Sequence, residues 1–162
     1  MRLLLASFLF GCALALAAEA TLAPNSPEFH KLYGDPASAW NWDGNPDSEG
    51  FNLQPNVHLT VMYGKDHRAC HVQLEPKIPT YTEEQYYLMS TERVSEILDE
   101  IAPTAKRGKV TSSTGMFCAG TLGIGLYDYE HVLIKRYLRC MEPNSEALVT
   151  MAFKREACPK AE

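Results

Sequence analysis

A run of acidic and amide side chains between residues 43 and 49 has the ligand types that a hard cation prefers. Oxygen-bearing side chains stand at every second position of this run: Asp43, Asn45, Asp47 and Glu49. Calcium binds several such oxygens on a tight bend, so the spacing resembles the start of a calcium loop. Ser48, however, stands where the sharp turn needs glycine, and Gln54 stands where a bidentate glutamate would complete the shell. An ordinary turn is the alternative interpretation, and no cofactor is predicted.

Four aromatic residues are candidates for holding a saccharide or a peptide. They are Trp40, Trp42, Tyr127 and Tyr129. Exposed rings beside amide and carboxylate groups offer an apolar face together with hydrogen-bond partners. In the alternative interpretation, both tryptophans only pack the N-terminal segment onto the rest of the chain. The predicted partner is accordingly an unknown protein or a saccharide.

No catalytic residue is predicted. The sequence contains no HExxH, paired CxxC, GxSxG or P-loop motif. A cysteine nucleophile would need a reduced thiol of low pKa near a histidine. The cysteines of this chain have a different explanation.

Five cysteines are present, and the first lies inside an N-terminal export signal. A basic start precedes an uncharged run, residues 3–18, in which Ala15-Leu16-Ala17 suits cleavage. We therefore predict a signal peptide at residues 1–17, whose removal takes Cys12 with it. The predicted location is secreted or periplasmic, and four remaining thiols in an oxidising compartment favour two disulfides.

Hairpin geometry favours one of the three possible pairings. If the strands predicted on either side of residues 128–129 form a hairpin, Cys118 lies opposite Cys140, close enough to bridge. Cys70 would then pair with Cys158 and close a loop of about 90 residues. In the chain-entropy model this closure stabilises the fold by about 4 kcal/mol. The other two pairings stay open.

The chain left after cleavage is acidic and has the size of one domain. Hydrophobic residues make up 46% and charged residues 22% of the sequence, both ordinary for a globular protein. Without Arg2, 14 Lys and Arg stand against 20 Asp and Glu, a formal charge of −6. Nucleic acid is disfavoured as a partner, because its binding depends on cations that neutralise phosphates. No second apolar run approaches the ~18 residues of a spanning helix, so no stable membrane insertion is predicted after cleavage.

Residues 18–56 are interpreted as a loop-rich N-terminal arm. Five prolines and three glycines are spaced too closely for regular elements of normal length. The arm also contains several aromatic residues, which predict that it is ordered and packs against the rest of the protein. One helical turn is expected near residues 28–33.

Residues 57–162 are predicted to form an α+β domain. A stripe of Val94, Ile97, Leu98 and Ile101 indicates an amphipathic helix, and alternating apolar residues indicate the strands. The predicted elements are a hairpin at 57–75, a helix from Ser90 or Thr91 to before Pro103, a loop at 105–115, and strands at 116–127, 132–140 and 147–155. This β-β-α-β-β-β order implies an antiparallel sheet with one helix packed on one face, stabilised by disulfides. No internal sequence repeat is visible.

Three stretches resemble small secreted proteins of Acidobacteria that have no assigned function. They are Tyr63–Cys70, Thr91–Gly108 and Lys154–Cys158. The resemblance implies an exported bacterial protein and transfers no site. A hairpin followed by a helix is also similar, at the level of fold alone, to the C-terminal domain of periplasmic TonB-like proteins.

Three functions are compatible with these features. The leading hypothesis is a secreted or periplasmic binding or interaction domain without catalysis. The second is a small extracytoplasmic hydrolase that acts on a polymer. The third is an envelope-associated assembly module whose exposed sheet edge pairs with a partner.

Overall fold

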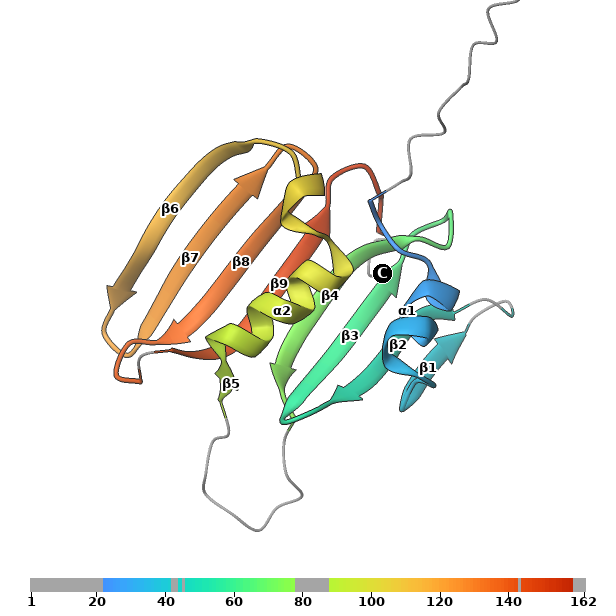
Figure 1. The fold of residues 1–162 in the computed structure, drawn as a ribbon, viewed down its shortest axis with the longest axis horizontal. Helices are drawn as coiled ribbons and strands as arrows, with labels where there is room; N and C mark the ends of the chain where they lie inside the picture. Colours follow the sequence, from blue (N-terminus) through green and yellow to red (C-terminus); the bar gives the residue numbers. More distant parts are fainter. Residues whose placement is uncertain (1–21, 42–43, 45, 78–87, 143, 159–162) are drawn as a thin grey trace, which may run out of the picture.

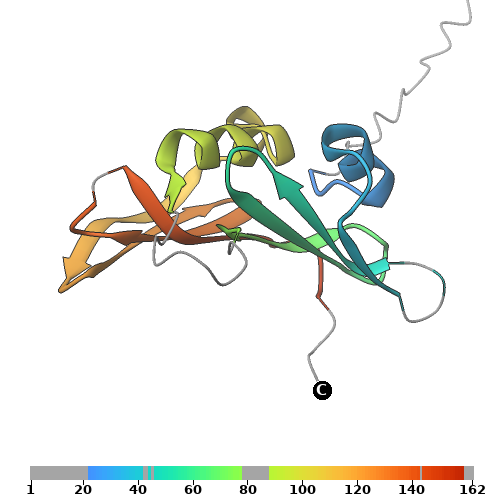
Figure 2. The same ribbon diagram turned by 90° about the horizontal axis from the view of Figure 1, so that it is seen from below.

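The structure is a computed structural model that describes residues 22–41, 44, 46–77, 88–142 and 144–158 (Figure 1). Within these residues, nine strands form one antiparallel sheet in the order β1-β2-β3-β4-β9-β8-β7-β6, and the short β5 pairs with β9. Figure 2 shows that both α-helices lie on the same face of this sheet. The other face carries no helix among the described residues.

The elements follow one another in two similar series. Their bounds are α1 Ser26–Tyr33, β1 Ser38–Asn41, β2 Pro46–Leu53, β3 Val57–Tyr63, β4 Ala69–Pro76, β5 Met89–Ser90, α2 Thr91–Ile101, a short 3-10 turn at Thr104–Lys106, β6 Val110–Ala119, β7 Leu122–Tyr129, β8 Val132–Arg139 and β9 Ser145–Phe153. A helix followed by four consecutive antiparallel strands therefore occurs twice. The last strands of the two series, β4 and β9, pair with each other from His71↔Ala152 to Leu74↔Val149.

The predicted element order is wrong at its N-terminal end, because the proposed arm contains α1, β1 and β2. Asn25 caps α1: its side chain accepts a hydrogen bond from the backbone N–H of Glu28, and the Glu28 carboxylate accepts one from the Asn25 N–H. Pro27 stands in the first turn of α1, where a missing N–H costs nothing. Pro46 begins β2. The prolines thus mark the ends of elements and do not exclude them.

A second correction concerns residues 105–127. The expected loop and single strand are in fact two paired strands, β6 and β7, which reverse at Gly120 and Thr121. Gly120 has a φ of +71°, a conformation that favours glycine in a tight turn. The strand predicted at residues 116–127 runs through this glycine, where the structure has a turn instead. The hairpin of β3 and β4, the helix α2, and the strands β8 and β9 lie within two residues of the predicted ranges.

The hydrophobic core lies between the two helices and one face of the sheet. The buried α2 side chains are the four of the predicted stripe: Val94, Ile97, Leu98 and Ile101. From α1, Phe29 has no exposed surface, and its ring packs against the rings of Phe51 and Tyr63. Residues of the N-terminal arm therefore belong to the same core as the rest of the sheet. None of the described helices is both long and apolar enough to cross a membrane.

Two disulfides join the pairs that hairpin geometry favoured. Cys70 bonds to Cys158 with a Cα–Cα distance of 5.2 Å, and Cys118 bonds to Cys140 with 5.9 Å. The second bridge arises differently from the prediction, since Cys118 lies on β6 and not on the strand that pairs with β8. A Cβ atom on Gly123 would lie 3.0 Å from the sulfur of Cys140 and 3.2 Å from that of Cys118. The bridge therefore lies directly over this glycine of β7.

Candidate functional site

A polar cleft of about 250 Å³ lies between α2 and the strands β7 and β8. It is lined by Ser95, Leu98, Asp99, Thr104, Arg107, Tyr127, Tyr129, Ile134 and Arg136. The lining combines two guanidinium groups, a carboxylate, two hydroxyl groups and two phenol rings over an aliphatic floor. A site of this composition can hold a ligand that offers both hydrogen-bond partners and an apolar face.

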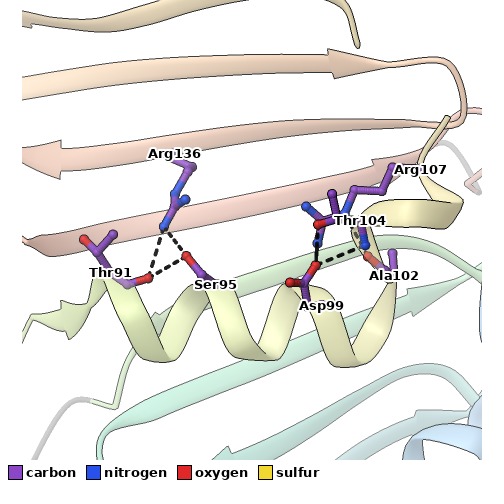
Figure 3. Close-up of polar contacts among 7 residues, drawn as sticks. All are labelled: Thr91, Ser95, Asp99, Ala102, Thr104, Arg107 and Arg136. Atoms are coloured by element: carbon purple, nitrogen blue, oxygen red, sulfur yellow. Dashed lines mark hydrogen bonds and ion pairs between the residues drawn. The ribbon is translucent and has the colours of Figure 1, made fainter. Parts of the chain in front are cut away.

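The helix α2 positions one wall of the cleft. Ser90 caps it by accepting a hydrogen bond from the backbone N–H of Arg93 at 3.1 Å. Ser95 and Asp99 are four residues apart, so both lie on the same side of the helix, beside the buried stripe. Figure 3 shows them facing the two arginines. The hydroxyl of Ser95 donates to the carbonyl of Thr91 at 2.7 Å.

One end of the cleft is built around Arg136 on β8. Its Nε donates to Glu146 Oε2 at 3.0 Å, and its Nη2 donates to the other carboxylate oxygen. Glu146 has no exposed surface. The same Nη2 also lies 3.3 Å from the Thr91 carbonyl and 3.2 Å from Ser95 Oγ (Figure 3). Arg136 thus connects β8, β9 and the first turns of α2.

The other end is built around Arg107, which is buried. Its Nε donates to the carbonyl of Ala102 at 2.7 Å, and its Nη2 donates to Asp99 Oδ1 at 2.7 Å (Figure 3). Asp99 Oδ1 also accepts from the backbone N–H and the hydroxyl of Thr104, at 3.1 and 2.6 Å. The guanidinium of Arg107 lies 5.7 Å from the ring centre of Tyr129, a cation–π contact.

The structure separates the aromatic residues that the sequence grouped together. Tyr127 and Tyr129 line the cleft. Trp40 lies on β1, with 65% of its surface exposed, and its partner Ser48 belongs to the sheet face turned away from the helices. β1 and β7 are separated by six strand spacings of about 4.8 Å, which is about 29 Å measured along the sheet. Trp42 lies outside the described residues.

The structure describes only two of the four candidate calcium ligands. Asp43 and Asn45 lie outside the described residues, whereas Asp47 and Glu49 belong to β2. Glu49 is 4% exposed, and its carboxylate contacts His30 Nε2 at 2.8 Å and accepts a hydrogen bond from the Tyr63 hydroxyl at 2.6 Å. Both of its oxygens therefore have protein partners. Among the described residues, no three His, Cys, Asp or Glu side chains are grouped so that they could hold a metal ion.

Ser26, His30 and Glu49 form a cluster that superficially resembles a hydrolytic triad. Ser26 Oγ lies 3.4 Å from His30 Nε2, and the same nitrogen lies 2.8 Å from Glu49. A proton relay needs the acid and the serine on different ring nitrogens, because one nitrogen cannot donate to the acid and accept from the serine at once. This geometry does not activate Ser26, and the cluster connects α1 to β2 and β3.

The polar residues of the cleft were not predicted from the sequence, although one signal for them was present. Val132 and Ile134 of β8 are buried in the core, and Arg136 and Leu138 stand in the same alternating phase along the strand. An arginine at a strand position where the alternation otherwise places apolar residues indicates a buried partner of opposite charge. Asp99, in contrast, lies off the apolar stripe of α2, and nothing in its spacing indicates Arg107 as its partner.

No protein-family model and no curated protein matches this sequence. Two solved structures are similar to parts of it. A DUF4309 family protein from Bacillus subtilis has a TM-score of 0.41 at 14% identity, over 80% of this chain and 78% of that one. A cysteine-rich secretory protein from Staphylococcus aureus has a TM-score of 0.41 at 9% identity, over 83% of this chain and 45% of that one. The chain thus spans less than half of the second protein, and these low similarities assign neither a family nor an activity.

Proposed function

We propose that this chain is a non-catalytic binding protein of a secreted or periplasmic compartment, and that the cleft between α2, β7 and β8 binds a neutral saccharide unit. The observation that carries the proposal is the convergence of Tyr127 and Tyr129 with hydroxyl, guanidinium and carboxylate groups around one small cavity. The two disulfides support an oxidising compartment.

The volume of the cleft favours a small ligand. Sites for drug-sized molecules usually measure about 300–1,000 Å³, so a cavity of about 250 Å³ suits a single ring or the end of a chain. The ligand class follows from the lining. Phenol rings offer an apolar face to the carbon skeleton of a sugar, while the surrounding polar groups offer partners to its hydroxyls.

The charges of the cleft favour a neutral ligand over an anion. Arg136 is paired with Glu146, and Arg107 is paired with Asp99. An anionic ligand would have to compete with these carboxylates, and the two pairs together carry no net formal charge. Within the described part of the chain, Nη1 of each arginine makes no hydrogen bond, which leaves donors for sugar oxygens.

The proposal is tested by NMR titration of the disulfide-bonded protein with glucose, N-acetylglucosamine, maltose, chitobiose and, as an anionic comparison, glucuronate. We expect a neutral sugar to shift amide signals of α2 and β7, and Tyr127→Ala to weaken its binding at least tenfold. Trp40→Ala is the matched aromatic control and should leave the affinity unchanged. A preference for glucuronate, or a loss of binding in Trp40→Ala but not in Tyr127→Ala, would contradict the proposal.

A further inference from the structure

The longest strand of the sheet is also one of its edges. β6 contains ten residues, Val110–Ala119, and among the described strands it pairs only with β7 (Figure 1). Every side chain described in this strand is exposed. The outward N–H and C=O groups of such a strand are a template for pairing with another chain.

Two devices that protect natural sheet edges are missing from β6. No charged residue and no proline occurs from position 110 to position 127, whereas edge strands commonly carry lysine or proline, or are very short. The opposite edge, β1, is protected by its length of only four residues and by a register shift. Register shifts also occur in β6, between Val110 and Ser112 and between Thr114 and Phe117. A strand added to this edge would therefore pair regularly only with the segments between and beyond these shifts.

Exposed apolar side chains lie directly beside this edge. Phe117 is 73% exposed and pairs across β6 and β7 with Ile124, which is 49% exposed, so the two side chains share one face of the sheet. Leu122, opposite Ala119, is 53% exposed. Adjacent exposed apolar residues of this kind are typical of a surface that is covered in an assembly.

We propose that β6 pairs antiparallel with β6 of a second copy of this chain around a two-fold axis, joining the two sheets through their edges. Three observations favour a second copy as the occupant. Pairing β6 with itself joins the regular segments of two ten-residue strands and closes as a dimer, whereas β6 with β1 offers only four residues and continues without closing. The second observation is charge: because β6 contains no charged residue, two copies of this acidic chain can pair along it without bringing like charges together.

The third observation is the position of the positively charged residue next to β6 in the sequence. Lys109 immediately precedes β6. Antiparallel pairing about the strand centre puts the two copies of Lys109 at opposite ends of a strand pair about 33 Å long. The clefts proposed to bind saccharide lie between α2 and the sheet, and no residue described in β6 lines them.

The test is sedimentation velocity of the disulfide-bonded protein from 1 to 200 µM. We expect a monomer–dimer equilibrium in this range, weakened at least tenfold by Phe117→Lys, an exposed position where folding should survive. Trp40→Lys, at the opposite edge, should leave the equilibrium unchanged. Circular dichroism and thermal unfolding of each variant establish that it is folded. Gly115→Cys, where an added Cβ has no atom within 4 Å, should form an intermolecular disulfide at high yield. Gly115 lies half a residue from the centre of β6, so its Cα would lie about 6 Å from that of its copy.

Several outcomes would overturn the dimer. A wild-type chain that is monomeric at 200 µM excludes it, and so does a dimer that survives Phe117→Lys but dissociates in Trp40→Lys. A monomer that instead binds an extended peptide along β6 would assign the edge to a different protein. Loss of saccharide binding with the dimer intact would affect only the function proposed for the cleft.

Discussion

Arg136 on β8 and Glu146 on β9 form an ion pair beneath α2 in which the glutamate is completely buried. Both guanidinium nitrogens Nε and Nη2 donate to the carboxylate, which is the bidentate arrangement that gives arginine pairs their strength and direction. Because Nη2 also contacts Thr91 and Ser95, the pair fixes the start of α2 against the sheet. The ion pair therefore contributes both to the stability of the fold and to the shape of the cleft.

Removal of Arg136 should be costly for folding. Arg136→Ala leaves the carboxylate of Glu146 buried without its counter-charge, which typically lowers the free energy of unfolding by about 3–5 kcal/mol. Glu96→Ala is the control, because Glu96 pairs with Arg93 at 2.9 Å in an exposed position, where ion pairs contribute about 1 kcal/mol or less. Urea denaturation measures both. Equal losses in the two variants would show that the buried pair is not a structural anchor.

Tyr33 and Tyr63 should resist ionisation. Burial, and then interactions with Glu100 and Glu49 respectively, raise the pKa of Tyr33 and of Tyr63 well above the usual value. In the unfolded chain these groups lose their protons near pH 10, so folded-state stability should fall as the pH rises above about 10, by about 1.4 kcal/mol per pH unit for each group. A rapid titration of absorbance at 295 nm should show a late-titrating tyrosine component before the protein unfolds. Tyr63→Phe should lower the number of late-titrating groups by one.

His71 should titrate below the range of an exposed histidine. Burial, and then the charge of Lys135, lower the pKa of His71. The unfolded chain therefore takes up this proton at higher pH than the folded chain, and this residue reduces stability as the pH falls below about 6.5. NMR titration of Lys135→Met should show a higher His71 pKa than in the wild type. Lys106→Met, a lysine of the 3-10 turn after α2, should produce no such rise.

Gly123 should tolerate no large side chain. A Cβ at this position would already lie 3.0 Å from a disulfide sulfur, and a branched side chain would have to displace the bridge between Cys118 and Cys140. We expect Gly123→Val to lower the free energy of unfolding by about 1–3 kcal/mol, the usual cost of overpacking. Gly115→Val is the comparison, since no atom lies within 4 Å of a Cβ built there. If both valines cost the same, β propensity and not the disulfide is responsible.

Local patterns accounted for a large part of the second series of elements. The apolar stripe of α2 and its Ser90 cap, the alternation in β3, β4, β8 and β9, and the stop before Pro103 are all contained in short stretches of sequence. The same patterns misled where turn residues were dense. Pro27 and Pro46 begin elements, and Gly120 makes a turn, yet composition alone does not distinguish these roles from a loop or a bulge.

The cysteine pairing shows how a correct result can have another physical cause. Cys118 and Cys140 are joined as the predicted hairpin geometry favoured, but the bridge connects β6 to the end of β8 over Gly123. The missing side chain of one glycine, and not a facing position on two neighbouring strands, makes the contact possible. The boundaries of β6, β7 and β8 decide which strands the bridge connects, and these boundaries depend on pairings across the whole sheet.

By itself, the sequence determined which residues alternate, where α2 begins and ends, and that four cysteines can form two bridges, because each of these depends on neighbours along the chain. Only the tertiary structure decided that the element order is duplicated, that β6 is an edge, and that Arg136 meets Glu146 while Arg107 meets Asp99. The physical reason is register: the partner of a buried charge is set by how β8 and β9 align and by where α2 crosses them. Tyr127 and Tyr129 were identified in advance by residue type, but the cleft that makes them a candidate site exists only in the folded sheet.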